Sequence, residues 1–441
     1  MRPEIRESGI GNREWGKRRF HPVVLLAGLL LLVALTLVGN ARAQAPAEPA
    51  SDDSPFPIPD SRPMVSLLTI GPGEIFFERF GHNAIVVRDP ASGEALAYNY
   101  GIFDFAEDDF LINFARGRMR YRIAADELAD DLAMYRAEGR SIVEQRLDVT
   151  PEQAHALAAF LEWNAQPENA LYRYDYFLAN CSTRVRDALD RALGGALKAQ
   201  SEGRSRGYTW RLDALRLMAP EPWLMLLIDL GLGPFADQRI DFWQESFVPE
   251  TLSDVVGQAS LRGTDGDARP LVDARVELSA GVVAEPPLLP PDLRGPFLGL
   301  GLALGALLAW LGRRTHPAAR VPLAAFASLF ALACGLAGLV LLFLWFGSEH
   351  RAAWRNENLL LLNPLCLALV PAWLGAARAR WRVRRATRVL AWLVVLAAAF
   401  ALFSKILPWF VQANLHWIVL LLPIHLALAL TLQRQATAPS P

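Results

Sequence analysis

The chain has 441 residues, of which 53 % are hydrophobic, and its 44 basic residues nearly balance 45 acidic ones. The net charge of −1 provides no global field for nucleic acid or for an acidic partner, so nucleic-acid binding is not expected. The apolar residues gather near the N-terminus and beyond residue 296. This distribution indicates a membrane protein that also carries a globular domain.

The first residues have the pattern of a secretory signal peptide. Six Lys or Arg and three Glu precede residue 20, an apolar run covers 23–38, and Ala41-Arg42-Ala43 follows it. Residues 1–43 are therefore interpreted as a signal peptide, with a retained N-terminal anchor as the alternative. In both cases the following residues are exported. Residues 44–63 are rich in Ala, Pro, Ser and Asp and predict a flexible tether.

Residues 64–284 predict a globular α+β domain. The β-rich run 83–88, the turn 89–93 and the returning run 95–101 predict two neighbouring strands. Farther on, Thr150-Pro151 with Gln153 predicts the capped start of a helix.

A second helix is expected to start at residue 181. Asn180 is a suitable cap, and an apolar face follows it at helical spacing, formed by Val185, Ala188, Leu189 and Leu193.

The last third of the chain predicts an all-α transmembrane bundle. A Pro-rich linker, 285–295, leads into the membrane region 296–432, and a tail of residues 433–441 ends the chain. Five apolar runs are each close to the length that crosses a bilayer: 296–312, 321–347, 359–377, 389–407 and 415–432. Arginines concentrate after the first and third runs, at 313–320 and 378–388. This bias places these loops and the tail in the cytoplasm and the globular domain in the periplasm, at the bacterial inner membrane.

The expected helix start at Cys181 is the most informative feature of the globular domain. It is the only cysteine there, since Cys334 and Cys366 fall in apolar runs. The free N–H groups at a helix N-terminus favour thiolate over thiol, and Arg184 and Arg186 add positive potential. The alternative is a small buried residue.

A nucleophilic cysteine also needs a base. His82, at the start of the first expected strand, is the best candidate, because His155 lies in the middle of a helix among ordinary residues. The alternative for His82 is a turn histidine whose ring is bonded to the backbone.

Three segments together resemble a known family. Phe80-Gly81-His82-Asn83-Ala84-Ile85, the run Tyr98 to Phe105, and Asn180-Cys181-Ser182-Thr183-Arg184 are similar to the signature of the Lnb-type N-terminal periplasmic domain. The resemblance covers roughly residues 64–260 and extends more thinly to Trp354, Asn356, Asn358 and Asn363-Pro364 in the membrane region. It implies a permuted papain-like fold, in which the histidine precedes the cysteine, and the activity of a bacterial lipoprotein N-acyltransferase.

The resemblance also implies roles for particular residues. Cys181 would be the nucleophile and His82 its base, and Asn99 is the candidate that orients the imidazole, with a strand-end residue serving the backbone as the alternative. The candidates for contact with substrate are Tyr100, Arg184, Arg118 and Asn363. Arg118 belongs to an alternating series, Arg116 to Arg122, which would present four guanidinium groups on one face of a strand.

The preferred hypothesis is a cysteine-dependent acyltransferase that needs no metal or cofactor. Its donor would be a phospholipid in the membrane and its acceptor the N-terminal amine of a lipoprotein. One alternative is a membrane-tethered cysteine peptidase or amidase acting on cell-wall peptides, and another is a non-catalytic lipid-binding module. The acyltransferase hypothesis predicts a hydrophobic groove that runs from Cys181 to the bilayer, whereas a peptidase would have a polar, solvent-open cleft.

Overall fold

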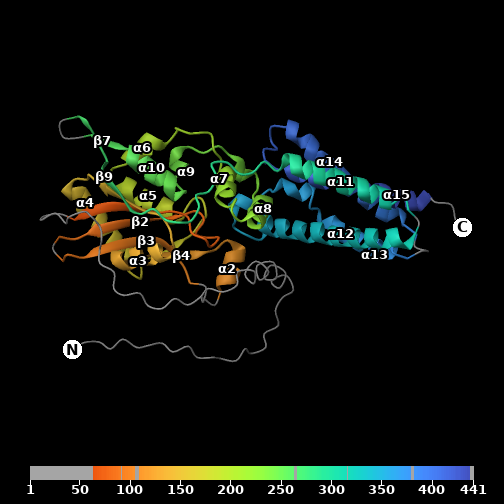
Figure 1. The fold of residues 1–441 in the computed structure, drawn as a ribbon, viewed down its shortest axis with the longest axis horizontal. Coiled ribbons are helices and arrows are strands. Elements are labelled where there is room, and N and C mark those ends of the chain that lie inside the picture. Colours follow the sequence, from red (N-terminus) through yellow and green to blue (C-terminus); the bar gives the residue numbers. More distant parts are fainter. Residues whose placement is uncertain are drawn as a thin grey trace, which may run out of the picture. The chain divides into compact units, whose positions relative to one another are not determined.

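A computed structural model describes residues 63–90, 92–104, 109–262, 266–314, 316–378 and 382–437. The expected signal peptide and nearly all of the tether lie outside these residues. Among the described residues, an α+β domain is followed by a helical membrane part, as the sequence predicts (Figure 1).

A seven-stranded antiparallel sheet forms the centre of the α+β domain, in the order β6-β4-β3-β2-β1-β5-β9. The strands are β1 (Met64–Ile70), β2 (His82–Arg88), β3 (Ala95–Ile102), β4 (Arg120–Glu127), β5 (Ile142–Leu147), β6 (Leu171–Arg173) and β9 (Val272–Ser279). The two strands expected around the turn 89–93 are therefore confirmed as β2 and β3. Their register places Asn99 opposite Ala84, two residues beyond His82.

Helices cover both faces of this sheet. They are α3 (Leu128–Ala137), α4 (Pro151–Ala165) and α5 (Cys181–Ala192). Because side chains alternate along a strand, Leu67 of β1 packs in one core with α4 and α5, while Leu68 packs in a second core with α3. The sheet therefore separates α5 from α3, and β2 and β3 lie between them.

The remaining elements of the domain are short. They are α2 (Phe110–Arg116), α6 (Ala196–Ser201), α7 (Trp210–Leu217), α8 (Pro222–Gly231), η1 (Pro234–Asp237), α9 (Phe242–Glu245), α10 (Pro249–Gln258) and the hairpin β7 (Ser260–Arg262) with β8 (Ala268–Pro270). Local capping signals predicted helix starts well. Thr150 caps α4 through a reciprocal pair of bonds with Gln153, as expected.

One expectation for this domain is wrong. The series Arg116 to Arg122 does not share one strand, because Arg116 ends α2 and Gly117 then turns the chain at φ +69° before β4 begins at Arg120. The apolar segment 222–228 forms α8, in which Met225 is buried while Trp223 and Leu227 are 41 and 52 % exposed.

The membrane part contains four long apolar helices among the described residues. They are α11 (Arg294–Leu311), α12 (Pro317–Phe346), α14 (Arg385–Phe403) and α15 (Leu415–Thr437). Between α12 and α14 lie η2 (Arg351–Ala353), η3 (Glu357–Leu360), η4 (Pro364–Leu369) and α13 (Val370–Ala376), and η5 (Ser404–Ile406) follows α14. The expected third span is thus a pair of segments bent by 43°. The second segment begins at Pro364, which has no N–H to continue the first.

Two glycines bring α11 against α15. A Cβ at Gly301 would lie 2.5 Å from the carbonyl oxygen of Val419, and one at Gly305 would lie 3.0 Å from that of Pro423. The pair therefore packs helices, as its small-xxx-small spacing predicts.

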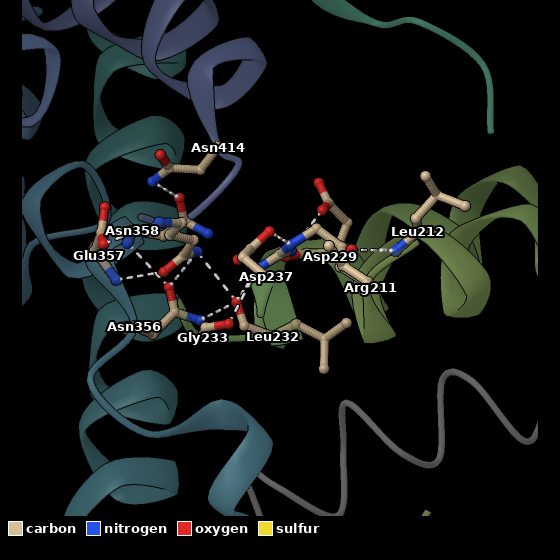
Figure 2. A network of polar contacts seen from close by, with 12 residues as sticks. Arg211, Leu212, Asp229, Leu232, Gly233, Asp237, Asn356, Glu357, Asn358 and Asn414 are labelled. Carbon is tan, nitrogen blue, oxygen red and sulfur yellow. Dashed lines mark hydrogen bonds and ion pairs between the residues drawn. The ribbon is translucent and has the colours of Figure 1, made fainter. Parts of the chain in front are cut away.

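A buried polar network joins the α+β domain to the membrane part (Figure 2). Arg211 of α7 donates to Asp229 of α8 at 2.6 Å and to Asp237 at 2.8 Å. Asp229 also accepts from Trp417 of α15 at 2.7 Å and lies 2.5 Å from Nε2 of His416.

The same network continues through asparagine side chains in the loop after α12 and in the loop before α15. Asn356 donates to the carbonyl oxygen of Leu230 at 2.9 Å, which satisfies the C-terminal end of α8. It also donates to that of Leu232 at 3.2 Å (Figure 2). Asn414 donates to Asn358 at 2.8 Å, and Asn358 donates to Leu230 at 3.1 Å. These bonds hold α8 at the start of the membrane helices.

Candidate active site

Cys181 occupies the first position of α5, as predicted. The Oδ1 atom of Asn180 accepts from the N–H of Thr183 at 2.9 Å, and the Thr183 hydroxyl accepts from the N–H of Asn180 at 2.8 Å. The Asn180 amide also donates to the carbonyl oxygen of Phe247 at 2.8 Å. This reciprocal cap fixes the first turn and leaves the cysteine at the positive end of the helix.

The thiol of Cys181 lies among backbone N–H groups. Burial raises its pKa above the ordinary value, while the N–H groups of Asn83, Ser182 and Cys181 itself, and the charge of Arg140, act to lower it. Burial is the largest of these effects, so the group is a thiol rather than a thiolate at neutral pH. It therefore requires a base to become a nucleophile.

His82 is held in one orientation and in the neutral form that a base needs. Its Nε2 lies 2.9 Å from Oδ1 of Asn99. Because the Nδ2 of Asn99 donates to the carboxylate of Asp131 at 2.7 Å, the amide must present its oxygen to the ring. His82 therefore carries its proton on Nε2, and Nδ1 is its acceptor nitrogen. Burial lowers the pKa of His82 to about 4, so the ring is neutral at pH 7.

The residues that follow the two candidates tie α5 to β2. The Ser182 hydroxyl lies 2.8 Å from Oδ1 of Asn83 and 2.7 Å from the carbonyl oxygen of Ser246. The Asn83 amide in turn donates to the Thr69 hydroxyl at 2.9 Å. All of these side chains are buried. The helix start thus lies directly against the strand start that carries His82.

Gly101 permits this close approach from the neighbouring strand. A Cβ at Gly101 would lie 3.4 Å from the Cβ of Cys181, and the backbone there has a φ of +97°. Only glycine adopts such a φ without strain, so the glycine of the second motif shapes the space beside the thiol.

Sequence reasoning missed two charged residues of the site. Asp131 on α3 lies behind Asn99, although they are 32 positions apart. Arg140 is the cation that acts on Cys181, whereas Arg184, expected in that role, lies over the rings of Tyr100 and Tyr172 at 5.4 and 4.9 Å. Asp131 lies in a helix and Arg140 in a loop, and no motif in the neighbouring residues marks either as part of a site. They reach the site only because the folded sheet places α3 and this loop beside β2.

Comparison with protein-family models places these features in a family. Residues 59–220 match the Lnb N-terminal periplasmic domain, and residues 300–437 match the Lnb transmembrane domain. The chain belongs to the Lnb family. No curated protein and no solved structure matched the chain. The two matches make it a bacterial membrane protein with a periplasmic domain, and Cys181, His82 and Asn99 all lie within the Lnb N-terminal domain.

The four expected substrate contacts of this Lnb protein each have a partner within the protein. The Tyr100 hydroxyl donates to Asn164 at 2.8 Å, and Arg118 bonds Glu349 at 2.7 Å. Asn363 accepts from the N–H of Leu365 at 3.0 Å and caps η4 in the membrane part. Arg184 lies over the rings of Tyr100 and Tyr172. None of these contacts involves Cys181 or His82. A role in substrate binding therefore stays a prediction for all four residues.

Metal-binding clusters and cavities are two further kinds of site that the described part of the Lnb chain could hold. The described residues contain no group of three or more His, Cys, Asp or Glu side chains that could hold a metal ion. A cavity of about 190 Å³ lies between α6, α9 and α10, bordered by Leu197, Arg204 and Phe242, and its lining does not include Cys181 or His82.

Proposed function

We propose that this protein is a lipoprotein N-acyltransferase of the inner membrane, with Cys181 as nucleophile, His82 as base and Asn99 as the group that orients His82. The observation that carries the proposal is the chain of contacts from Asp131 through Asn99 to His82, together with the Ser182–Asn83 bond that joins the residues after Cys181 and His82. A neutral histidine and a protonated thiol are the resting forms that general-base activation requires.

In the first step, Nδ1 of His82 takes the proton of the Cys181 thiol, and the sulfur attacks the ester carbonyl carbon of a phospholipid. An S–C bond forms and the C–O ester bond breaks. The departing alkoxide takes the proton from His82, so a lysophospholipid leaves and the acyl chain stays as a thioester on Cys181. Backbone N–H groups in the first turn of α5 stabilise the oxyanion that develops on the carbonyl oxygen.

In the second step, the α-amine of a lipoprotein N-terminal cysteine attacks the thioester. The amide C–N bond forms, the C–S bond breaks, and the amine proton passes through His82 to the thiolate. This restores both side chains. Two steps through a covalent intermediate replace one difficult transfer between two molecules held in a membrane.

The surroundings of Cys181 favour an acyl chain over a cell-wall peptide. Cys181 and Tyr172 pack against the same apolar core, and the ring of Tyr172 lies 6.0 Å from that of Tyr100. Tyr174 stacks on Tyr121 with ring centroids 4.1 Å apart. Such an aromatic environment suits an apolar substrate.

Mass spectrometry of lipoprotein N-termini tests the function. Cells that carry the wild-type protein should contain N-acylated lipoproteins, and cells with Cys181→Ala should contain the same lipoproteins with a free amine. A C181A strain with unchanged N-termini but altered peptidoglycan fragments would replace the acyltransferase with a peptidase or amidase. A C181A strain with neither change would support the remaining alternative, a non-catalytic lipid-binding module.

A further inference from the structure

Three parts of the periplasmic domain expose large apolar side chains. They are the segment 71–81 between β1 and β2, α2 and α8. Their exposed fractions lie between 40 and 53 %, and we call these six residues the apolar rim: Ile75, Phe76, Leu111, Ile112, Trp223 and Leu227. Apolar side chains gathered in this way on a soluble domain mark a surface that meets another apolar phase.

The rim lies where the membrane helices begin. The carbonyl oxygen of Arg116, at the end of α2, accepts from the N–H of Glu349 at 2.8 Å, and that of Phe114 lies 2.8 Å from Nε2 of His350. Both partners follow α12 directly, and α8 is held by the same loop through Asn356. In Figure 1, α2 and α8 accordingly lie at the end of the domain that adjoins the membrane helices.

The segment 71–81 belongs to the same end. Arg79 forms an ion pair with Glu221 at 3.1 Å, next to the start of α8. At the end of α12, Trp345 stacks on Phe346, which is 74 % exposed. Aromatic pairs of this kind are typical of the boundary between membrane and water. The rim therefore lies at the level where α12 leaves the hydrocarbon.

A run of aromatic rings leads from the rim toward the candidate nucleophile. Successive ring centroids lie 5.2, 5.9, 4.8 and 4.1 Å apart along the series Phe76, Phe77, Phe103, Tyr121 and Tyr174. Phe103 lies two residues beyond Gly101, which faces Cys181. The rings thus form one continuous apolar series that starts at the exposed rim and passes beside the segment that faces the thiol.

We propose that the apolar rim inserts into the leaflet on the periplasmic side and that the aromatic run receives the acyl chain of a phospholipid on its way to Cys181. The acyl-chain half rests on the proposed function, whereas the insertion of the rim does not. A rim in the leaflet would present the ester of a membrane lipid to the site without extracting the whole molecule into water.

Fluorescence depth measurements test the insertion independently of activity. A polarity-sensitive dye on Ile112→Cys would be compared with one on Trp163→Cys, a 53 % exposed residue of α4, both in full-length Cys181→Ala protein in phosphatidylethanolamine–phosphatidylglycerol vesicles. Labelled Cys181→Ala alone corrects for reaction at Cys334 and Cys366, which are buried.

The dye at position 112 should lose roughly half of its intensity to lipids brominated in the acyl chains, and it should be shielded from aqueous iodide. The dye at position 163 should respond in the opposite way. Equal iodide quenching at both positions would overturn the insertion. Shielding at 112 without quenching by brominated lipid would also overturn it, because a protein would then cover the rim.

A kinetic comparison tests the path of the lipid. The double variant Leu111→Ser/Ile112→Ser should raise KM for phospholipid by about tenfold, because two apolar side chains no longer enter the leaflet. Its reaction with a water-soluble short-chain ester should stay at the wild-type rate, and Trp163→Ser should change neither. An equal loss on both esters would contradict the proposal. Wild-type protein without acyl transfer would refute the proposed function instead, and the dye measurements would still decide the insertion.

Discussion

Two buried carboxylates, Asp131 beside the candidate site and Asp229 at the membrane junction, have opposite surroundings. Asp229 accepts from Arg211 and Trp417 and lies next to His416. These partners outweigh burial, and they hold the pKa of Asp229 below its usual value. Asp131 accepts from the neutral amide of Asn99, and burial together with the charges of Asp126 and Asp130 raises its pKa to about 6.

The difference separates a structural carboxylate from one that can be tuned. A buried charge with a cation and several donors stays ionised at every physiological pH, and it stabilises one arrangement of the chain. A buried carboxylate whose donor is a neutral amide titrates near neutral pH, and its protonation weakens the bond that orients that amide. Asp229 at the membrane junction is thus a permanently ionised structural carboxylate, whereas Asp131 at the candidate site is one that titrates.

The largest effect is expected at the thiol. Cys181→Ala should abolish acyl transfer, and its free energy of unfolding should change by about 1 kcal/mol or less, because a small half-buried side chain is removed at a helix start. His82→Ala should lose nearly as much activity, and the double variant no more, since the two groups act as one unit. Turnover measurements and thermal unfolding in detergent check this. Substantial residual turnover in C181A would exclude covalent catalysis by this residue.

The second prediction concerns the polar network that joins α8 to the membrane part. Asp229→Asn should lower the free energy of unfolding by about 3–5 kcal/mol, because it removes a charge partner of the buried Arg211. Thermal unfolding of the full-length protein in detergent measures this. Asp292→Asn removes an exposed carboxylate near the start of α11 and should leave the unfolding midpoint unchanged. Equal midpoints for the two variants would show that the junction does not stabilise the protein.

The third prediction concerns the tunable carboxylate. Asp131→Asn should reduce kcat by about tenfold, because the bond that orients Asn99 loses its charge, which is worth roughly 1.5 kcal/mol. KM for the donor should stay unchanged, since Asp131 acts through Asn99 and His82. Asp130→Asn, on the exposed neighbour in α3, is the matched control, and at pH 8, where Asp131 is ionised in both proteins, it should behave as wild type. If the two variants lose activity equally, Asp131 does not position Asn99.

The fourth prediction is a pH profile. Wild-type kcat/KM should fall as pH decreases through about 6, where Asp131 gains a proton, and again near 4, where His82 does. Asp131→Asn should lack the first step and keep the second. Stability responds to Asp131 in the opposite direction. Because its folded pKa exceeds 3.8, its contribution is complete below that pH and is lost as pH rises through about 6. Profiles of equal shape would rule out this assignment.

The smallest effect is expected at the exposed ion pair between Arg118 and Glu349, whose side chains are 57 and 37 % exposed. Arg118→Ser should reduce activity by less than about threefold, and added salt should remove the difference from wild type. Assays at low and high ionic strength measure this. Complete loss of activity in a folded variant would make Arg118 part of the substrate site.

Local features of the fold were predictable because they depend on neighbours in the chain. The caps at Thr150 and Asn180, the β2–β3 turn and the helix start at Cys181 each follow from a few consecutive residues. The same local reasoning failed for Arg116 to Arg122, where alternation suggested a strand. Gly117 instead ends a helix there, and contact with the loop after α12 stabilises that turn.

The sequence by itself determined the order of the two Lnb domains, the capped start of α5 and the candidate pair of His82 and Cys181. These depend on hydrophobic patterning, capping residues and short motifs. Only the tertiary structure decided that Asp131 supports Asn99, that Arg140 lies near the thiol, and that α2 of the apolar rim contacts the loop after α12. Such contacts join residues tens to hundreds of positions apart. Their existence depends on the packing of the sheet and of the α12 loop, which no local pattern encodes.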